Sequence, residues 1–309
     1  MPPPIPPLLS PYLRLPPESS LILLTHVLGA STNWLVLRYL YSALTASDPS
    51  APSSPHERVL ELEPHIGARK EETNDDDPSV VLLISFMRDL PFWRDAARKL
   101  GLDLSRLAQR RRFAFVDGVS GLCLPRPCWE AQTRDATVLS DVRLESVHAE
   151  VLRAVGALRK GEGAGRRKVV LVVDQMDFLL AAGGEGVHAV ALSALLMEWR
   201  QIVHSTIVTL AADSPLVLPQ HTPLETNHAA FLLSIAHQAR PVLGVRLLDT
   251  GTARDISGVV RITKGDADED EDENETEYHV GDEWEAKDGK EFLYYVGADG
   301  GVKVFERGQ

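Results

Sequence analysis

Residues 169–174 read Val-Val-Leu-Val-Val-Asp, an apolar run without polar alternation that stops at an aspartate. Residues 80–86, Val-Val-Leu-Leu-Ile-Ser-Phe, have the same character. A strand that is apolar on both faces is typical of a parallel sheet covered by helices on both sides. Because neighbouring parallel strands need a crossover connection, we expect a helix between most of these strands.

The rest of the chain supplies the other elements of such an α/β fold. Further strands are expected at residues 21–27, 113–117 and 206–210, and helices at 34–46, 92–107, 141–159, 187–204 and 224–240. Gly101 is expected to divide the second helix. Right-handed crossovers would bring the carboxyl ends of the strands to one rim of a mostly parallel sheet.

The sequence changes after Arg240. Strand-like segments at 242–248, 258–263, 291–296 and 302–305 follow one another without a helix, and a glycine-rich turn at 297–301 predicts a hairpin. We expect these C-terminal strands to extend the same sheet in antiparallel fashion. The predicted organisation is a proline-rich extension over residues 1–17, extended on a surface, and a single domain over 18–309 with flexible loops at 47–79 and 266–277.

The chain of 309 residues has a net charge of −12, but the charge is unevenly distributed. Residues 266–277 hold nine acids and residues 71–77 hold five, so the remaining chain has a net charge of about +2. The acidic total therefore describes two predicted loops, and it does not exclude a nucleic-acid partner for the folded body.

Composition excludes several other classes of protein. The chain has no uninterrupted apolar run of about eighteen residues, which argues against a membrane span, and its N-terminus lacks the pattern of a secretory signal. Two cysteines, Cys123 and Cys128, are too few for a disulfide framework. We expect a reducing compartment, the cytoplasm or the nucleus.

The first strand leads into the segment where a phosphate-binding loop would lie. That loop needs the pattern G-x-x-x-x-G-K-[ST], in which glycines and the lysine hold phosphate and the hydroxyl binds Mg²⁺. Aligned on Gly29, the chain has Trp34 in place of the second glycine, Leu35 in place of the lysine and Val36 in place of the hydroxyl. The sequence therefore predicts an eroded loop and no nucleotide cofactor.

Asp174 stands where a Walker-B aspartate would end its strand. The alternative is an aspartate that bonds to loop N–H groups, and the eroded phosphate loop favours this second interpretation. A working NTPase that uses Asp174 for metal and an unrecognised lysine for phosphate stays open as another hypothesis.

No other catalytic or metal pattern is complete. Residues 118–122 resemble a nucleophile elbow but have Leu122 where the second glycine belongs. The two cysteines lack zinc-site spacing, and the ten histidines form no H-E-x-x-H pattern. We therefore expect no catalytic residue and no metal site.

Two sets of side chains are candidates for contacts with partners. The basic residues that are candidates for contacts with a nucleic-acid backbone are Arg110, Arg111, Arg112, Arg166, Arg167 and Lys168, and the alternative for both clusters is a solvated surface. The strand around Phe292, Tyr294 and Tyr295 is apolar on both faces. We prefer burial of its second face by a partner; the alternative is a cover from within the chain, such as the proline-rich N-terminus.

The order of these elements and the eroded loop resemble the non-catalytic RecA-like subunits of the Elongator complex. Three segments carry the resemblance: residues 80–86 leading into Phe92-Trp93-Arg94, residues 113–118, and the run Leu-Leu-Asp-Thr-Gly-Thr-Ala-Arg-Asp-Ile-Ser-Gly-Val-Val-Arg-Ile-Thr at 247–263. The chain is most similar to the sixth of these subunits. The resemblance covers about residues 18–265, and the acidic insertion and the 47–79 loop depart from it.

The resemblance implies a structural role. The subunit would assemble with Elongator subunits four and five into a heterohexameric ring, and through them join the catalytic Elongator subcomplex. The ring would bind tRNA and support modification of the wobble uridine (U34). Arg254 is a candidate for sensing a neighbour's nucleotide, although an ordinary loop arginine is the simpler interpretation. An accessory RecA-like protein of DNA repair would share this fold and stays open as an alternative.

Overall fold

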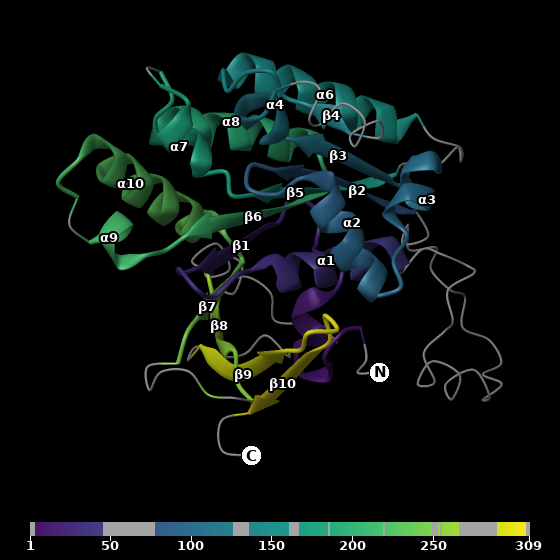
Figure 1. Ribbon diagram of the computed structural model, residues 1–309. Helices are drawn as coiled ribbons and strands as arrows, with labels where there is room; N and C mark the ends of the chain where they lie inside the picture. Colours follow the sequence, from purple (N-terminus) through teal and green to yellow (C-terminus); the bar gives the residue numbers. More distant parts are fainter. Residues whose placement is uncertain are drawn as a thin grey trace, which may run out of the picture.

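A single ten-stranded sheet organises the molecule (Figure 1). The computed structural model describes residues 4–45, 78–125, 136–160, 167–184, 186–218, 220–248, 253, 255–265 and 289–306. The strand order is β10-β9-β8-β7-β1-β6-β5-β2-β3-β4.

Seven strands run parallel, as the apolar runs predicted. They are β1 (Leu21–His26), β2 (Ser79–Ser85), β3 (Phe113–Asp117), β4 (Thr137–Val138), β5 (Lys168–Asp174), β6 (Ser205–Ala211) and β7 (Pro241–Arg246). β1 lies between β6 and β7, and β5 lies between β6 and β2. The carboxyl ends of β1, β5 and β6 therefore meet at one rim of the sheet.

The C-terminal strands extend this sheet in antiparallel fashion. β8 (Gly258–Lys264), β9 (Lys290–Val296) and β10 (Val302–Glu306) follow β7, and β9 and β10 form the predicted hairpin. The prediction was wrong for β7, which pairs parallel with β1 and antiparallel only with β8. The helix before β7 brings the chain back beside β1. β7 can therefore pair parallel with β1 as the last strand of the parallel series.

Helices cover both faces of the sheet. One face carries α1 (Asn33–Thr45), α2 (Leu90–Lys99) and α3 (Leu104–Gln109), and the other carries α6 (Leu144–Arg159), α8 (Ala189–Ile202) and α10 (Pro223–Gln238). Short helical turns α4 (Ser120–Cys123), α7 (Phe178–Ala182) and α9 (Ser214–Val217) lie in the connections.

Local signals explain where these helices begin and end. Gly101 separates α2 from α3 with φ at +80°, which glycine adopts without strain. The carboxylate of Asp103 then caps α3 by accepting from the Arg106 N–H at 3.1 Å. At α10, Thr222 and Glu225 form a reciprocal capping box.

The core has two layers, one on each side of the sheet. Trp93 of α2 is fully buried in the first layer and Trp199 of α8 in the second. The buried strands β2, β5 and β6 contribute alternate residues to the two layers, which is why their sequences show no polar alternation.

The proline-rich N-terminus differs from the predicted extended segment. Pro7–Leu13 forms a 3₁₀-helix, η1, whose Leu9, Tyr12 and Leu13 are buried in the first core layer. Proline fixes φ near the value that a 3₁₀-helix uses, and the leucines supply an apolar face, so the segment folds onto the domain.

The two predicted flexible loops lie outside the described residues, except that β2 already begins at Ser79. Within the described part of the chain, no helix has both the length and the apolar character needed to cross a bilayer.

Candidate functional site

The connection from β1 to α1 is a tight turn at the place where a phosphate loop would lie. The Ala30 N–H donates to the Val27 carbonyl at 2.9 Å, and Gly29 takes φ of +89° within this turn. A phosphate loop needs a wider arc of N–H groups that point at a common centre. Four residues closed by their own hydrogen bond do not provide that arc.

An acidic side chain takes one of the N–H groups at this turn. The backbone N–H of Leu28 donates to Oδ1 of Asp213 at 2.7 Å, and Asp213 follows β6. The side chain of Leu247 lies against Gly29, because an added Cβ there would be 3.2 Å from its Cδ1. A carboxylate and an apolar side chain therefore border the position that a phosphate would need, and the carboxylate repels an anion.

The residues that replace the phosphate-binding groups are packing residues. Trp34, Leu35 and Val36 are all buried in the first core layer. The Trp34 ring packs against Tyr294 of β9 with centroids 4.9 Å apart. Leu35 is fully buried, so the lysine position of the motif has become part of the core.

Asp174 is at the rim, but its carboxylate is enclosed. Ser85 Oγ donates to Oδ2 at 2.7 Å and Thr209 Oγ1 donates to Oδ1 at 3.0 Å. Burial raises the pKa of Asp174, and the hydrogen bonds from Ser85 and Thr209 oppose that rise. Both oxygens accept from strand hydroxyl groups and not from the loop N–H groups that the sequence suggested. Among the described residues, no cluster of three histidine, cysteine or acidic side chains is arranged to hold a metal ion.

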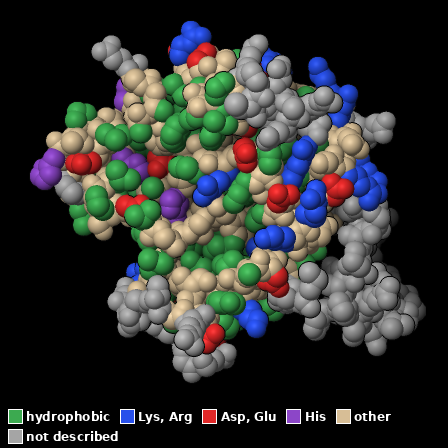
Figure 2. Space-filling view, viewed as in Figure 1, with side chains coloured by type: hydrophobic (Ala, Val, Ile, Leu, Met, Phe, Trp, Pro, Cys, Tyr) green, Lys and Arg blue, Asp and Glu red, His purple; other side chains and the backbone are tan. Residues whose placement is uncertain are grey.

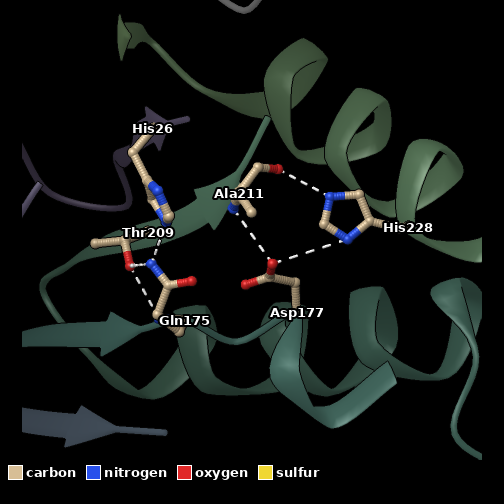
Figure 3. Close-up of polar contacts among 6 residues, drawn as sticks. All are labelled: His26, Gln175, Asp177, Thr209, Ala211 and His228. Atoms are coloured by element: carbon tan, nitrogen blue, oxygen red, sulfur yellow. Dashed lines mark hydrogen bonds and ion pairs between the residues drawn. The ribbon is translucent and has the colours of Figure 1, made fainter. Parts of the chain in front are cut away.

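A set of polar contacts beside Asp174 was not predicted from the sequence (Figure 3). Gln175 has φ of +59°, and its N–H donates to Thr209 Oγ1 at 2.8 Å. Its side-chain amide contacts Nε2 of His26, at the end of β1, at 2.5 Å. These contacts tie the ends of β1, β5 and β6 together where a nucleotide-binding protein would keep space for its ligand.

A buried histidine and aspartate form a second set of polar contacts nearby (Figure 3). Oδ2 of Asp177 accepts from the Ala211 N–H at 3.2 Å and lies 3.8 Å from Nδ1 of His228. Nε2 of His228 lies 2.8 Å from the Ala211 carbonyl oxygen. Burial raises the pKa of Asp177, and the charge of His228 opposes the rise. His228 shares the helical spacing of Phe231 and Ile235, and this pattern could have identified it as buried.

The serine of the elbow-like segment is part of an ordinary turn. Ser120 is buried, and its hydroxyl donates to Asp117 Oδ2 at 2.8 Å while its N–H donates to Oδ1. The hydroxyl therefore stabilises the turn after β3. This agrees with the turn that the sequence predicted in place of a nucleophile elbow.

The two basic clusters, distant in sequence, meet at the opposite rim of the sheet. Arg167 donates to the carbonyl oxygen of Arg111 at 2.8 Å, and Lys168 begins β5 two strands away from β3. Arg112 donates to the carbonyl oxygen of Leu44 at 2.8 Å. Arg110 is exposed beside them. Figure 2 shows Lys and Arg on the side of α2 and α3, and His on the side of α9 and α10.

The C-terminal hairpin buries one of its two apolar faces within the chain. Phe292 and Tyr294 are buried within the chain, against α1 and η1. These two interface candidates are therefore covered from within the molecule and are not free for a partner, whereas burial of the second face by a partner stays a prediction. Tyr295 points to the opposite face and is half-buried. Arg166 and Arg254 lie outside the described residues.

Comparison with known proteins agrees with this geometry. A family model described as Elongation complex protein 6 matches residues 77–282. The Elongator complex protein 6 homolog of Schizosaccharomyces pombe is 24% identical over 227 residues, which cover 73% of this chain and 79% of that protein.

Two solved structures from Pyrococcus horikoshii match this chain over most of its length. An uncharacterized protein, solved in complex with an unknown peptide, has a TM-score of 0.53 at 13% identity, and the match covers 94% of this chain and 93% of that one. A KaiC-like protein has a TM-score of 0.49 at 12% identity, over 94% and 90% of the two chains. The fold is RecA-like, with β6 between the strand of the eroded phosphate loop and the strand of Asp174. Because the family model matches well over half of its length, the chain belongs to the Elongation complex protein 6 family.

Proposed function

We propose that this chain is a non-catalytic RecA-like subunit of the Elongator complex. In this proposal it assembles with subunits four and five into a heterohexameric ring, and through them joins the catalytic subcomplex. The ring binds tRNA and supports modification of its wobble uridine, in the cytoplasm or the nucleus. Membership of the Elongation complex protein 6 family supports a place in the Elongator complex. The hexameric ring, the tRNA contact and the location in the cell go beyond that membership.

One observation carries the non-catalytic role. Backbone N–H groups of the turn after β1 already have partners in the protein. Ala30 donates to the Val27 carbonyl oxygen, and Leu28 donates to the carboxylate of Asp213. With Leu35 buried in the core, no cation is available at the lysine position of the motif. A nucleotide would have to break these contacts before it could bind.

Exposed apolar side chains at the same rim support a role in assembly. Leu28 is 85% exposed and Leu218, at the end of α9, is 75% exposed. The bond from Leu28 to Asp213 brings the two segments together. Large exposed apolar side chains on these two segments make them our candidates for a surface that a neighbouring subunit covers.

Co-expression with subunits four and five tests the assembly. We expect a complex whose mass by light scattering corresponds to six chains, two of them copies of this one. If the chain elutes as a monomer in the presence of both partners, the proposed assembly is wrong.

The purified complex then tests the tRNA contact. Replacement of the exposed Arg110 by alanine should weaken tRNA binding and reduce the slope of log affinity against log salt by about 0.7–0.9 if one phosphate contact is lost. Arg98→Ala is the control, since Arg98 is exposed on α2 and paired with Asp95 at 3.4 Å. Equal salt slopes for the two variants would remove Arg110 from the tRNA surface.

A further inference from the structure

A buried imidazole and a buried carboxylate face each other where α10 packs against the end of β6 (Figure 3). His228 of α10 is 3% exposed, and Asp177, immediately before α7, is 9% exposed. Nδ1 of His228 lies 3.8 Å from Oδ2 of Asp177, too far for a hydrogen bond but close enough for a strong electrostatic interaction away from water. The protonation state of this pair therefore affects how α10 is held to the sheet.

The carbonyl group of Ala211 fixes one hydrogen on the imidazole ring. Nε2 of His228 lies 2.8 Å from the Ala211 carbonyl oxygen. A carbonyl oxygen can only accept, so Nε2 carries the hydrogen of this bond. In a neutral imidazole Nδ1 would then have no hydrogen, and its lone pair would face the carboxylate of Asp177. Two acceptors that face each other in a buried place are unfavourable, and one additional proton removes the conflict.

The carboxylate of Asp177 is held in this position by the backbone of β6. The N–H of Ala211 donates to Oδ2 at 3.2 Å. The other oxygen, Oδ1, is buried and accepts no hydrogen bond from a described residue. Burial raises the pKa of Asp177, and the charge of His228 opposes this rise. An ionised carboxylate at this place therefore needs a positive neighbour, and His228 is in position to supply one.

The other titratable side chains of the elements around the pair have contacts of their own. They are His26 of β1, Asp174 of β5, His188 before α8, Asp213 after β6 and Glu225 of α10. Of these, the charge of His26 also acts on Asp177, but less than that of His228. Glu198, Arg200 and His237 lie toward the other ends of α8 and α10. The proton is thus a matter for His228 and Asp177 together.

We propose that His228 and Asp177 share one proton at neutral pH, and that this proton makes the pair a pH-sensitive clamp between α10 and the sheet. With the proton, the two groups attract each other. Without it, a carboxylate faces a bare ring nitrogen, and α10 loses this attachment to the end of β6. α9 packs against α10, and the exposed Leu218 follows α9. The clamp therefore supports an element of the surface proposed for a neighbouring subunit.

The proton count gives the direction of the pH dependence. In the unfolded chain an aspartate loses its proton near pH ~3.9 and a histidine near pH ~6.5. Above about pH 6.5 the folded chain holds a proton that the unfolded chain has released. The pair should therefore lower the stability of the chain as the pH rises through this range, until the pair itself has lost the proton.

Asp177→Asn removes the need for the proton. The amide of the variant can accept from the Ala211 N–H and donate to Nδ1 of a neutral His228. In urea unfolding of the full chain from about pH 6.5 to about pH 8.5, the unfolding constant of the natural chain relative to this variant should increase by up to about tenfold per pH unit. Asp95→Asn is the control, because it removes an exposed carboxylate and should follow the natural chain. A ratio between the natural chain and Asp177→Asn that does not change with pH would overturn the proposal.

An NMR titration of the natural chain tests the clamp without any variant, and so it also decides the case in which Asp177→Asn does not fold. His237 lies on the same helix and is exposed, which makes it an internal reference. The ring signals of His228 should change with pH only above the range in which those of His237 change. If the two rings titrate over the same range, the pair keeps no additional proton and the clamp does not exist.

Discussion

Asp174 illustrates how a residue can keep its position in a fold while its chemistry changes. It ends β5 at the rim where parallel α/β proteins bind ligands. Ser85 and Thr209 occupy both of its oxygens, and its surroundings are buried. The carboxylate therefore joins three strands through hydrogen bonds instead of facing a metal ion.

The raised pKa of Asp174 predicts a dependence of stability on pH. A carboxyl group whose pKa is higher in the folded chain contributes its full stabilisation only below its unfolded pKa of about 3.9. That contribution is lost as the pH rises through the folded pKa. Asp174→Asn cannot ionise, so relative to the natural chain its free energy of unfolding should increase as the pH rises from 4 to 8.

Urea unfolding at several pH values measures this difference. Asp95→Asn is the control, because Asp95 is exposed and its only described ion pair is with Arg98. A difference between Asp174→Asn and the natural chain that stays constant with pH would contradict a buried carboxyl at this position.

The sequence showed which phosphate-binding residues are missing, but it did not show which contacts have replaced them. Leu35 and Val36 could be recognised as wrong for phosphate from a pattern of eight residues. The bond from Leu28 to Asp213 joins residues 185 positions apart, and no local pattern encodes it. The same holds for His26 and Gln175, which meet only because β1 and β5 flank β6.

The C-terminal hairpin shows why a strand's partners are harder to predict than the strand itself. Apolar residues and a glycine-rich turn identified β9 and β10 from the sequence. Their cover is α1, about 260 residues earlier, where Arg38 is buried and donates to the Gly300 carbonyl oxygen at 2.8 Å. Burial lowers the pKa of Arg38 to about 10, and its bonds to Trp34 and Gly300 hold the hairpin against α1.

Tyr294 should therefore stabilise the isolated chain. Its ring is buried against Trp34, so Tyr294→Ala should lower the free energy of unfolding by about 3 kcal/mol or more, as large-to-small changes of buried aromatic residues do. Tyr295→Ala, on the half-buried opposite face, is the matched control and should cost about 1 kcal/mol. Chemical unfolding of the isolated variants measures both. Equal small losses would mean that Tyr294 is stabilised by a partner and not by α1.

Elements with strong periodicity were predicted within a few residues of their observed ends. β3 was predicted at 113–117, where it lies, and the periodic helix at 187–204 is α8 over 189–202. The direction of β7 was missed because a single strand's sequence does not record which neighbour it joins. The burial of η1 was missed because proline content dominated the interpretation, although Leu9 and Leu13 supplied an apolar face.

For the whole molecule, the net charge is a poor guide to partners. Fourteen acids lie in two segments outside the described residues, and the rest of the chain has a net charge of about +2. The rim at the carboxyl ends of β1 and β6 carries the exposed Leu28, and the exposed Leu218 ends α9. Separate surfaces for RNA and for a neighbouring subunit are what the proposed ring would use.

The closed turn after β1 means that this RecA-like chain no longer has a nucleotide site. Titration calorimetry of the isolated chain with ATP and Mg²⁺ measures whether nucleotide binds. The closed turn at Val27–Ala30 and the enclosed Asp174 predict no heat of binding at millimolar ATP. Saturable, Mg²⁺-dependent binding that is abolished in Asp174→Ala would contradict the claim and favour a working NTPase.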